Sequence, residues 1–159
     1  MLTFLFWILA LAAVYSYFLY PLVLKLVATL RGVRHVKPVD NAPPAFMTLI
    51  VTAYNEERRI REKIENTLAI NFDKSRLELI VASDCSEDAT DSIVNEYADR
   101  GVRLVRATER LGKENAQLTA IKQARGDVFV FSDVATQIPE DALIKLERYF
   151  TDVSIGAVS

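Results

Sequence analysis

Two aspartates, Asp84 and Asp133, each stand two residues after a short apolar run of the kind that forms a buried strand. Carboxylates bind divalent cations, and a nearby lysine such as Lys113 can offset the charge of a diphosphate. Another apolar run ends in Thr52–Glu57, whose last four residues are polar. If these runs are neighbouring parallel strands, the groups meet at one edge and form a ligand site. The alternative is that they are the ordinary polar residues of turns.

The elements that must position these groups alternate along the chain. Short apolar runs predict strands, and apolar residues spaced three or four apart predict helices. The expected strands are Met47–Ala53, Leu77–Ala82, Val102–Val105 and Val128–Phe131, with a fifth beginning at Ile155–Val158. The expected helices have apolar faces at Ile60, Ile64 and Leu68, at Ile93, Val94, Tyr97 and Ala98, at Ala116, Ala120, Ile121 and Ala124, and, after an opening at Pro139, at Leu143, Leu146 and Phe150. This alternation predicts an α/β fold with a mostly parallel sheet, helices on both faces and ligands at the carboxyl ends of the strands.

Several other kinds of site do not match the sequence. A dinucleotide fingerprint needs three clustered glycines after the first strand, and none lies between Met47 and Asp73. Gly112 and Lys113 lack the rest of a phosphate-binding P-loop. One cysteine and one histidine provide no Cys/His metal spacing. A net charge of −2 and the lack of a basic, aromatic-interleaved stripe give no reason to expect a nucleic-acid partner.

The N-terminal 24 residues, Met1–Leu24, carry no charged side chain. As a helix they would span roughly 36 Å, enough for the hydrocarbon core of a membrane. Pro21 is expected to kink this helix or mark its passage toward the lipid headgroups. A cleaved signal peptide is the alternative, but no Lys or Arg precedes the apolar run, and the run is too long. We therefore expect a transmembrane helix at residues 1–30.

A basic, proline-containing linker is expected at residues 31–45, between this helix and a globular part at residues 46–159. The basic residues Lys25, Arg31, Arg34 and Lys37 all lie on the C-terminal side of the apolar run. The positive-inside rule then predicts that the globular part is cytoplasmic.

From about Pro44 to Ser159 the chain resembles the family 2 glycosyltransferases of GT-A fold, especially the membrane-bound branch that includes cellulose, chitin and hyaluronan synthases. Four motifs, in order, carry the resemblance. They are Tyr54-Asn55-Glu56, the run Ser83–Thr90, Gly112-Lys113 with Asn115-Ala116, and Gly126-Asp127 followed by Asp133. The second is similar to the family's Asp-Gly-Ser-x-Asp-x-Thr turn and the last to the approach to its Asp-x-Asp motif.

The resemblance implies a function and a set of site residues. It implies transfer of a sugar from a UDP- or GDP-sugar, with inversion, to a glycan or lipid acceptor. The donor would be bound by Thr52, Ala53, Tyr54, Glu56, Asp84, Lys113 and Asp133, with Tyr54 and Asp84 at the nucleoside. Asp133 would hold a divalent metal, Mg²⁺ or Mn²⁺.

The sequence departs from the family pattern in three respects. Cys85 stands where glycine is common, and we interpret it as structural. Ala135 replaces the second carboxylate of Asp-x-Asp, which weakens the case for the metal. Family members continue beyond a length like this one, so the chain is expected to be an N-terminal portion, inactive by itself, with its general base beyond Ser159. The alternative is a non-catalytic, membrane-tethered nucleotide-binding fragment or pseudoenzyme.

Individual residues also have structural interpretations. Glu56 could place negative charge in the first turn of a helix, and Lys113 could be a solvated surface lysine. Asp88 is expected to serve the start of a helix and not to contact a ligand. Glu140 and Asp141 fit the first turn of the helix that follows Pro139.

Overall fold

The computed structural model describes residues 1–31, 44–152 and 154–158. It divides into two units, Met1–Val36 and Lys37–Ser159. Most of the expected linker at residues 31–45, including Arg34, Lys37 and Pro43, lies outside the described residues.

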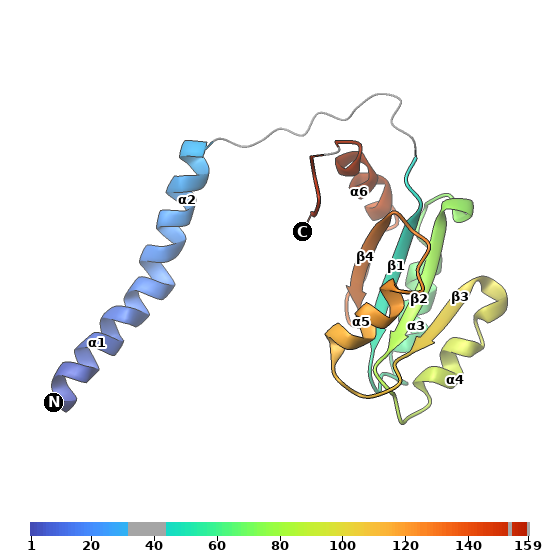
Figure 1. Cartoon of the computed structure of the whole chain (residues 1–159), viewed down its shortest axis with the longest axis horizontal. Coiled ribbons are helices and arrows are strands. Elements are labelled where there is room, and N and C mark those ends of the chain that lie inside the picture. The colour runs from blue at the N-terminus through green and yellow to red at the C-terminus, as the bar shows by residue number, and fades with distance from the viewer. Residues whose placement is uncertain (32–43, 153, 159) are drawn as a thin grey trace. The chain divides into compact units, whose positions relative to one another are not determined.

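The N-terminal unit is one apolar helix built from three consecutive segments, α1 (Leu2–Val14), the π-helical η1 (Tyr15–Leu19) and α2 (Tyr20–Arg31) (Figure 1). It is long and apolar enough to cross a membrane, with a mean hydropathy of 2.0 in its most apolar 18-residue window. Pro21 has no N–H to donate into the helix, and the wider π-helical turn lies just before it.

The C-terminal unit contains a four-stranded parallel sheet. Its strands are β1 (Met47–Ala53), β2 (Leu77–Ser83), β3 (Val102–Arg106) and β4 (Val128–Asp133). They lie in the order β3-β2-β1-β4, and every neighbouring pair is parallel. The first four predicted strands and the parallel sheet are therefore confirmed.

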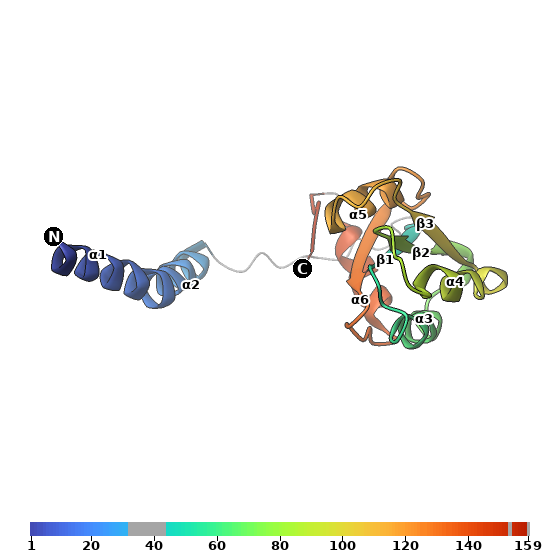
Figure 2. The ribbon, with the colours of Figure 1, turned by 90° about the horizontal axis from the view of Figure 1, so that it is seen from below.

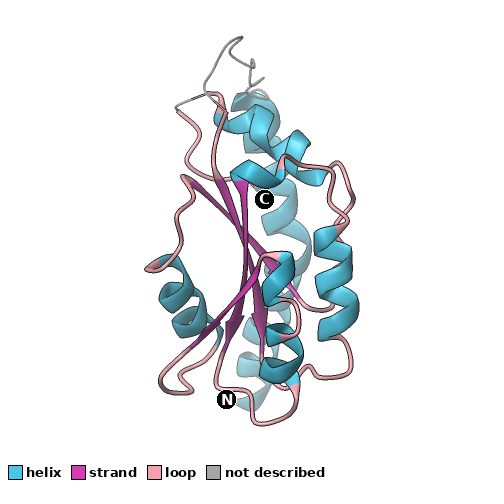
Figure 3. Ribbon diagram, turned by 90° about the vertical axis from the view of Figure 1, so that its right-hand side faces the viewer, coloured by secondary structure: helices cyan, strands magenta, loops and turns pink. Residues whose placement is uncertain are grey.

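Helices cover both faces of the sheet, as predicted (Figures 2 and 3). One face of the central strands, including Leu49 and Val51, packs in a core with the side of α3 (Ile60–Leu68), α4 (Thr90–Asn95) and α6 (Ala142–Phe150). The opposite face, including Ile50 and Ile80, packs against Ala116 and Ala120 of α5 (Lys113–Ile121). The alternation of inward side chains along a strand explains why a nearly continuous apolar run is needed here.

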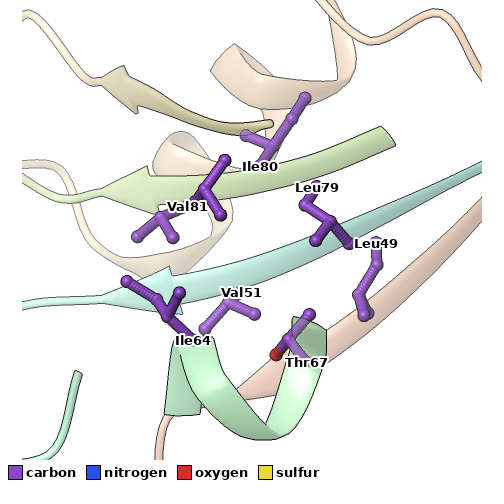
Figure 4. Close-up of a pocket in the computed structure, with 8 residues that line it drawn as sticks. Leu49, Val51, Ile64, Thr67, Leu79, Ile80 and Val81 are labelled. Atoms are coloured by element: carbon purple, nitrogen blue, oxygen red, sulfur yellow. The ribbon is translucent and has the colours of Figure 1, made fainter. Parts of the chain in front are cut away.

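A small cavity of about 10 Å³ lies in the core between α3 and the sheet (Figure 4). Its lining includes Leu49, Val51, Ile64 and Leu79, and Thr67 is its polar member. The Thr67 hydroxyl donates to the Lys63 carbonyl at 2.8 Å. Such a space offers a water too few partners, so the cavity is a packing gap and not a ligand site.

Several details of the prediction are wrong. Tyr97 and Ala98 lie beyond the end of α4, and Ala124 lies beyond the end of α5. Ile155–Val158 is not a strand: the described part of this run has no place in the sheet, and Gly156 and Ala157 give it little side chain to pack. The last helix begins at Ala142 instead of Pro139. Residues 139–141 precede it in a turn, closed by the Ala142 N–H, which donates to the Pro139 carbonyl at 3.1 Å.

Candidate functional site

The ends of β1, β2 and β4 bring the predicted site residues to one edge of the sheet. Thr52 is the register partner of Asp133 across β1 and β4, and Ala53 is the partner of Ser83 across β1 and β2. The Asp84 N–H continues this pairing and donates to the Ala53 carbonyl at 3.0 Å. The backbone of three neighbouring strands therefore fixes the spacing of the two aspartates.

The beginning of α5 connects both aspartates. The Gly112 N–H donates to Oδ1 of Asp84 at 3.2 Å, and Nζ of the next residue, Lys113, lies 2.5 Å from Oδ1 of Asp133. Gly112 has a φ of 96°, a left-handed conformation that favours glycine. One dipeptide thus joins carboxylates from two strands, and the predicted proximity of Lys113 to Asp133 is confirmed.

The two aspartates have different surroundings. Asp84 is buried, with 5% of its surface exposed. The side chains of Asp133 and Lys113 are 57% and 54% exposed. An ion pair this exposed adds little to stability, so its charges are available to a ligand. A nucleotide at this edge would meet a buried carboxylate at one point and an open charge pair at the other.

The turns after β1 and β2 hold each other together. Three consecutive backbone N–H groups of the first turn donate to side chains of the second: Asn55 to Ser86 at 3.2 Å, Glu56 to Thr90 at 2.8 Å, and Glu57 to Asp88 at 3.1 Å. Burial alone would raise the pKa of Asp88, but hydrogen bonds from Thr90 and from the Glu57 N–H hold it below the ordinary value. The motif residues Ser86, Asp88 and Thr90 therefore hold the two turns together, which supports the structural interpretation of Asp88.

Tyr54 and Glu56, two more predicted site residues, leave the first turn in different surroundings. The guanidinium of Arg110 lies 4.0 Å from the centre of the Tyr54 ring, a cation–π contact. The Glu56 carboxylate accepts from Arg59 at 3.0 Å near the start of α3. Arg110 is a neighbour of the site that the sequence did not single out.

The departure from the family pattern at Cys85 can be described from its backbone conformation and its contacts. Its φ of 58° is left-handed, which is the conformation that a glycine at this turn would adopt freely. The Cys85 thiol is 3.2 Å from the Ala107 carbonyl and donates to it. This engagement fits the prediction that Cys85 is structural.

Lys63 lies near the site and was not predicted from the sequence. It lies on α3 and only 1% of its surface is exposed, yet it carries an ammonium. Burial lowers the pKa of Lys63, while the negative charge of Asp133 opposes that shift. A signal was present: with Ile60, Ile64 and Thr67, Lys63 lies on the face of α3 that helical spacing turns toward the sheet.

A divalent metal fits this site only with help from the donor. Within the described residues, no three His, Cys, Asp or Glu side chains are grouped closely enough to hold one. Asp133 is the carboxylate beside Lys113, and Ala135 supplies no ligand. Mg²⁺ commonly binds through one or two carboxylates together with substrate phosphates and waters. Asp133 therefore fits as a single protein ligand.

A parallel sheet with acidic groups after its strands is an α/β arrangement of the kind that binds ligands at the carboxyl ends of the strands. Residues 48–158 match the family model described as glycosyl transferase family 2. The chain belongs to that family.

Its relatives are glycosyltransferases from several organisms. The chain is 33% identical to a dolichyl-phosphate beta-glucosyltransferase of Drosophila melanogaster, over 64% of this chain and 35% of the relative. It is 30% identical to a poly-beta-1,6-N-acetyl-D-glucosamine synthase of Staphylococcus aureus, over 71% of this chain and 27% of the relative. The chain thus spans about a third of the length of these curated relatives.

Solved structures show the same GT-A fold. A mannosyltransferase from Pyrobaculum calidifontis, in complex with GDP-Man and Mn²⁺, superposes with a TM-score of 0.72 at 30% identity, covering 94% of this chain and 44% of that one. Residues 1–349 of S. aureus TarS, in complex with UDP-GlcNAc, give a TM-score of 0.56 at 28% identity, covering 63% of this chain and 29% of that one. The predicted family and fold are confirmed.

Proposed function

We propose that the C-terminal unit binds the nucleotide-sugar donor of an inverting glycosyltransferase. The observation that carries this proposal is the link made by Gly112 and Lys113 between the two acidic strand ends, Asp84 and Asp133. It places a buried carboxylate and an open charge pair on either side of one helix start. A nucleoside diphosphate has matching parts, a base and ribose whose N–H and O–H groups can donate hydrogen bonds to a carboxylate, and a diphosphate that needs positive charge.

Each predicted residue has a role in this proposal. Thr52, Ala53, Tyr54, Glu56 and Asp84 lie along the nucleoside. Lys113 offsets the charge of the diphosphate, and Asp133 holds a divalent metal together with that diphosphate. The metal, when bound, stabilises negative charge on the leaving nucleoside diphosphate. Complexes of relatives with GDP-Man and Mn²⁺ and with UDP-GlcNAc support the donor class and the metal.

Calorimetry on the full 159-residue chain in detergent tests the donor assignment. UDP or GDP should bind weakly, and more tightly with Mn²⁺ than with EDTA. Asp84→Ala should weaken binding under both conditions, whereas Asp133→Ala should remove mainly the part that depends on Mn²⁺. Asp99→Ala is the matched control, since Asp99 is exposed in η3 (Ala98–Arg100), before β3 begins. Equal binding by wild type and both site variants would refute the assignment.

We infer that the acceptor is a glycan or a lipid. Support comes from relatives named for a dolichyl phosphate and for a polymer of N-acetylglucosamine. In an inverting transfer a base takes the proton of the acceptor hydroxyl as that hydroxyl attacks the anomeric carbon. Asp84 and Asp133 are assigned to the donor, so we expect at most slow donor hydrolysis from this chain alone. Labelled UDP-sugars offered with a panel of acceptors test this, and robust product lost in Glu140→Gln or Asp141→Asn would contradict it.

We propose further that the helix Leu2–Arg31 anchors the protein in a membrane with the C-terminal unit in the cytoplasm, where nucleotide-sugars are made. The length and hydropathy of the helix support the span, and Lys25 and Arg31 near its C-terminal end support the orientation. A reporter fused after Ser159 should be active only if it works in the cytoplasm. Activity of a reporter that works on the other side of the membrane would reverse the orientation.

A further inference from the structure

One face of α3 is hydrogen-bonded to the end of β4 and to the segment that follows it. Five hydrogen bonds join Glu62, Lys63 and Asn66, which we call the α3 clamp, to residues 132–138. The Asn66 amide donates to the Ile138 carbonyl and accepts from the Ile138 N–H, each at 2.9 Å, and the Gln137 amide donates to Glu62 at 3.0 Å. The other two bonds come from Lys63.

Lys63 binds the segment on both sides of Asp133. Its ammonium donates to the Ser132 hydroxyl at 2.8 Å and also to the Thr136 carbonyl. Ser132 is the residue before Asp133, and Thr136 ends the turn in which the Thr136 N–H donates to the Asp133 carbonyl at 3.2 Å. The lysine therefore closes the turn from its buried side, opposite the exposed ion pair of Asp133 with Lys113.

Burying an ammonium group costs free energy because the charge is removed from water. An apolar side chain of similar length could occupy the same position without the cost of removing a charge from water. What the ammonium adds is a fixed point of attachment for two acceptors and an attraction toward the charge of Asp133. With Ala135 in place of a second carboxylate, Asp133 remains as the protein ligand of the proposed metal. The position of the metal then depends on how firmly Asp133 is held.

We propose that Lys63 is a positioning residue for the donor's diphosphate and its metal, fixing the Ser132–Thr136 turn so that the Asp133 carboxylate keeps one place at the site. This inference rests on the proposed function, because it assigns Lys63 to the part of that site where Asp133 acts. In this role Lys63 contacts Ser132 and Thr136 and need not contact the donor or the metal. It acts through the turn. Mutating a residue that orients a metal ligand typically weakens metal affinity about 10–100-fold.

The test compares Lys63→Met with Asn66→Leu in the full chain in detergent. Mn²⁺ is titrated in the presence of UDP or GDP and followed by the electron paramagnetic resonance signal of free Mn²⁺, and nucleotide binding in EDTA is measured by calorimetry. Lys63→Met should weaken the Mn²⁺-dependent binding about 10-fold while changing binding in EDTA less than about 2-fold. Asn66→Leu, the control, loses two hydrogen bonds farther along the same segment and should leave the Mn²⁺-dependent binding within about 3-fold of wild type.

The outcomes separate the two proposals. If wild type binds neither nucleotide, the proposed function fails and the role of Lys63 with it. If wild type binds and Lys63→Met binds equally well, the function stands and the positioning role is wrong. A loss that is the same in both variants, and the same with and without Mn²⁺, would show a purely structural lysine and overturn the proposal.

A second variant keeps the test decisive if circular dichroism shows that Lys63→Met does not fold. Ser132→Ala removes one acceptor of the ammonium and leaves the lysine in place. It should weaken Mn²⁺-dependent binding about 3-fold and leave binding in EDTA unchanged. No change in either measurement would overturn the positioning role.

Discussion

Glu78 stands near the start of β2 and Asp84 directly after its end, and the surroundings of these two carboxylates differ. The Glu78 side chain is 3% exposed and accepts hydrogen bonds from Thr48, from Arg103 and from both the backbone and the side chain of Arg125. Gly126 completes this packing, because a Cβ there would come within 2.6 Å of the Thr48 nitrogen. At this end of the sheet the carboxylate is saturated with partners.

At the carboxyl end Asp84 and Asp133 have fewer hydrogen-bond partners than Glu78. Asp84 accepts from one backbone N–H, that of Gly112, among the hydrogen bonds described for its side chain, and Asp133 is exposed beside Lys113. Burial with full hydrogen bonding makes a carboxylate stabilising, whereas exposure beside a cation leaves it able to exchange partners. The contrast between the two ends separates acids that hold the fold from acids that await a ligand.

The largest expected effect is at the structural end. Glu78→Ala should lower the free energy of unfolding by about 3–5 kcal/mol, because it leaves buried donors and arginine charge without a partner. Urea unfolding followed by circular dichroism measures it, since the only tryptophan, Trp7, lies in the N-terminal helix. Glu65→Ala is the control: Glu65 forms an exposed ion pair with Arg100, and its loss should cost less than about 1 kcal/mol. Equal losses would abolish the contrast.

The dependence of stability on pH gives a second test of Glu78. Burial alone would raise the pKa of Glu78, but its hydrogen bonds with Arg125, Thr48 and Arg103 hold it below the ordinary value of a glutamate. A carboxylate with a depressed pKa in the folded state stabilises above its unfolded pKa, and that stability is lost as the pH falls through the folded pKa. The gap in unfolding free energy between wild type and Glu78→Ala should therefore shrink below pH 4.5. If the gap widens in acid, the pKa of Glu78 is raised in the folded state and not lowered.

A smaller effect is expected at the ligand end. Asp84→Asn keeps an oxygen that can accept from the Gly112 N–H, so the turn should survive with a loss of less than about 1 kcal/mol of stability. The affinity for UDP or GDP should fall about 5-fold, by the same factor with Mn²⁺ and with EDTA, because a charged acceptor is lost at the nucleoside. Calorimetry under both conditions checks this. A loss confined to Mn²⁺ would move Asp84 to the metal side.

The sequence predicts the sheet well because its strands are short apolar runs between polar turns, and a parallel arrangement leaves few alternatives. It predicts Asp84, Lys113 and Asp133 as neighbours for the same reason, since parallel strands end at one edge. Lys63 escaped because its role depends on a contact between α3 and a turn 69 residues away from it at Ser132. Ile155–Val158 was mistaken for a strand because apolar composition alone cannot say whether a pairing partner is present.

The smallest effect is expected at Cys85, where the ligand end carries backbone strain. A residue with a Cβ in the left-handed region costs roughly 1 kcal/mol that glycine does not pay. Cys85→Gly relieves that strain but loses the contact of the thiol with the Ala107 carbonyl and gains freedom in the unfolded chain, so its net change should stay within about 1 kcal/mol. Cys85→Ala keeps the strain and loses the contact.

The glycine variant should therefore be more stable than the alanine variant by less than about 1 kcal/mol, and that difference measures the strain minus the extra freedom of glycine in the unfolded chain. Urea unfolding of the two variants gives this difference directly, and an alanine variant as stable as the glycine one would show that the strain does not exceed the extra freedom of glycine in the unfolded chain. Because the thiol is engaged with Ala107, both variants should bind UDP or GDP within about 2-fold of wild type. A larger loss in both would mean that Cys85 faces the donor, and the turn after β2 would then recognise the ligand through its side chains as well as through Asp84.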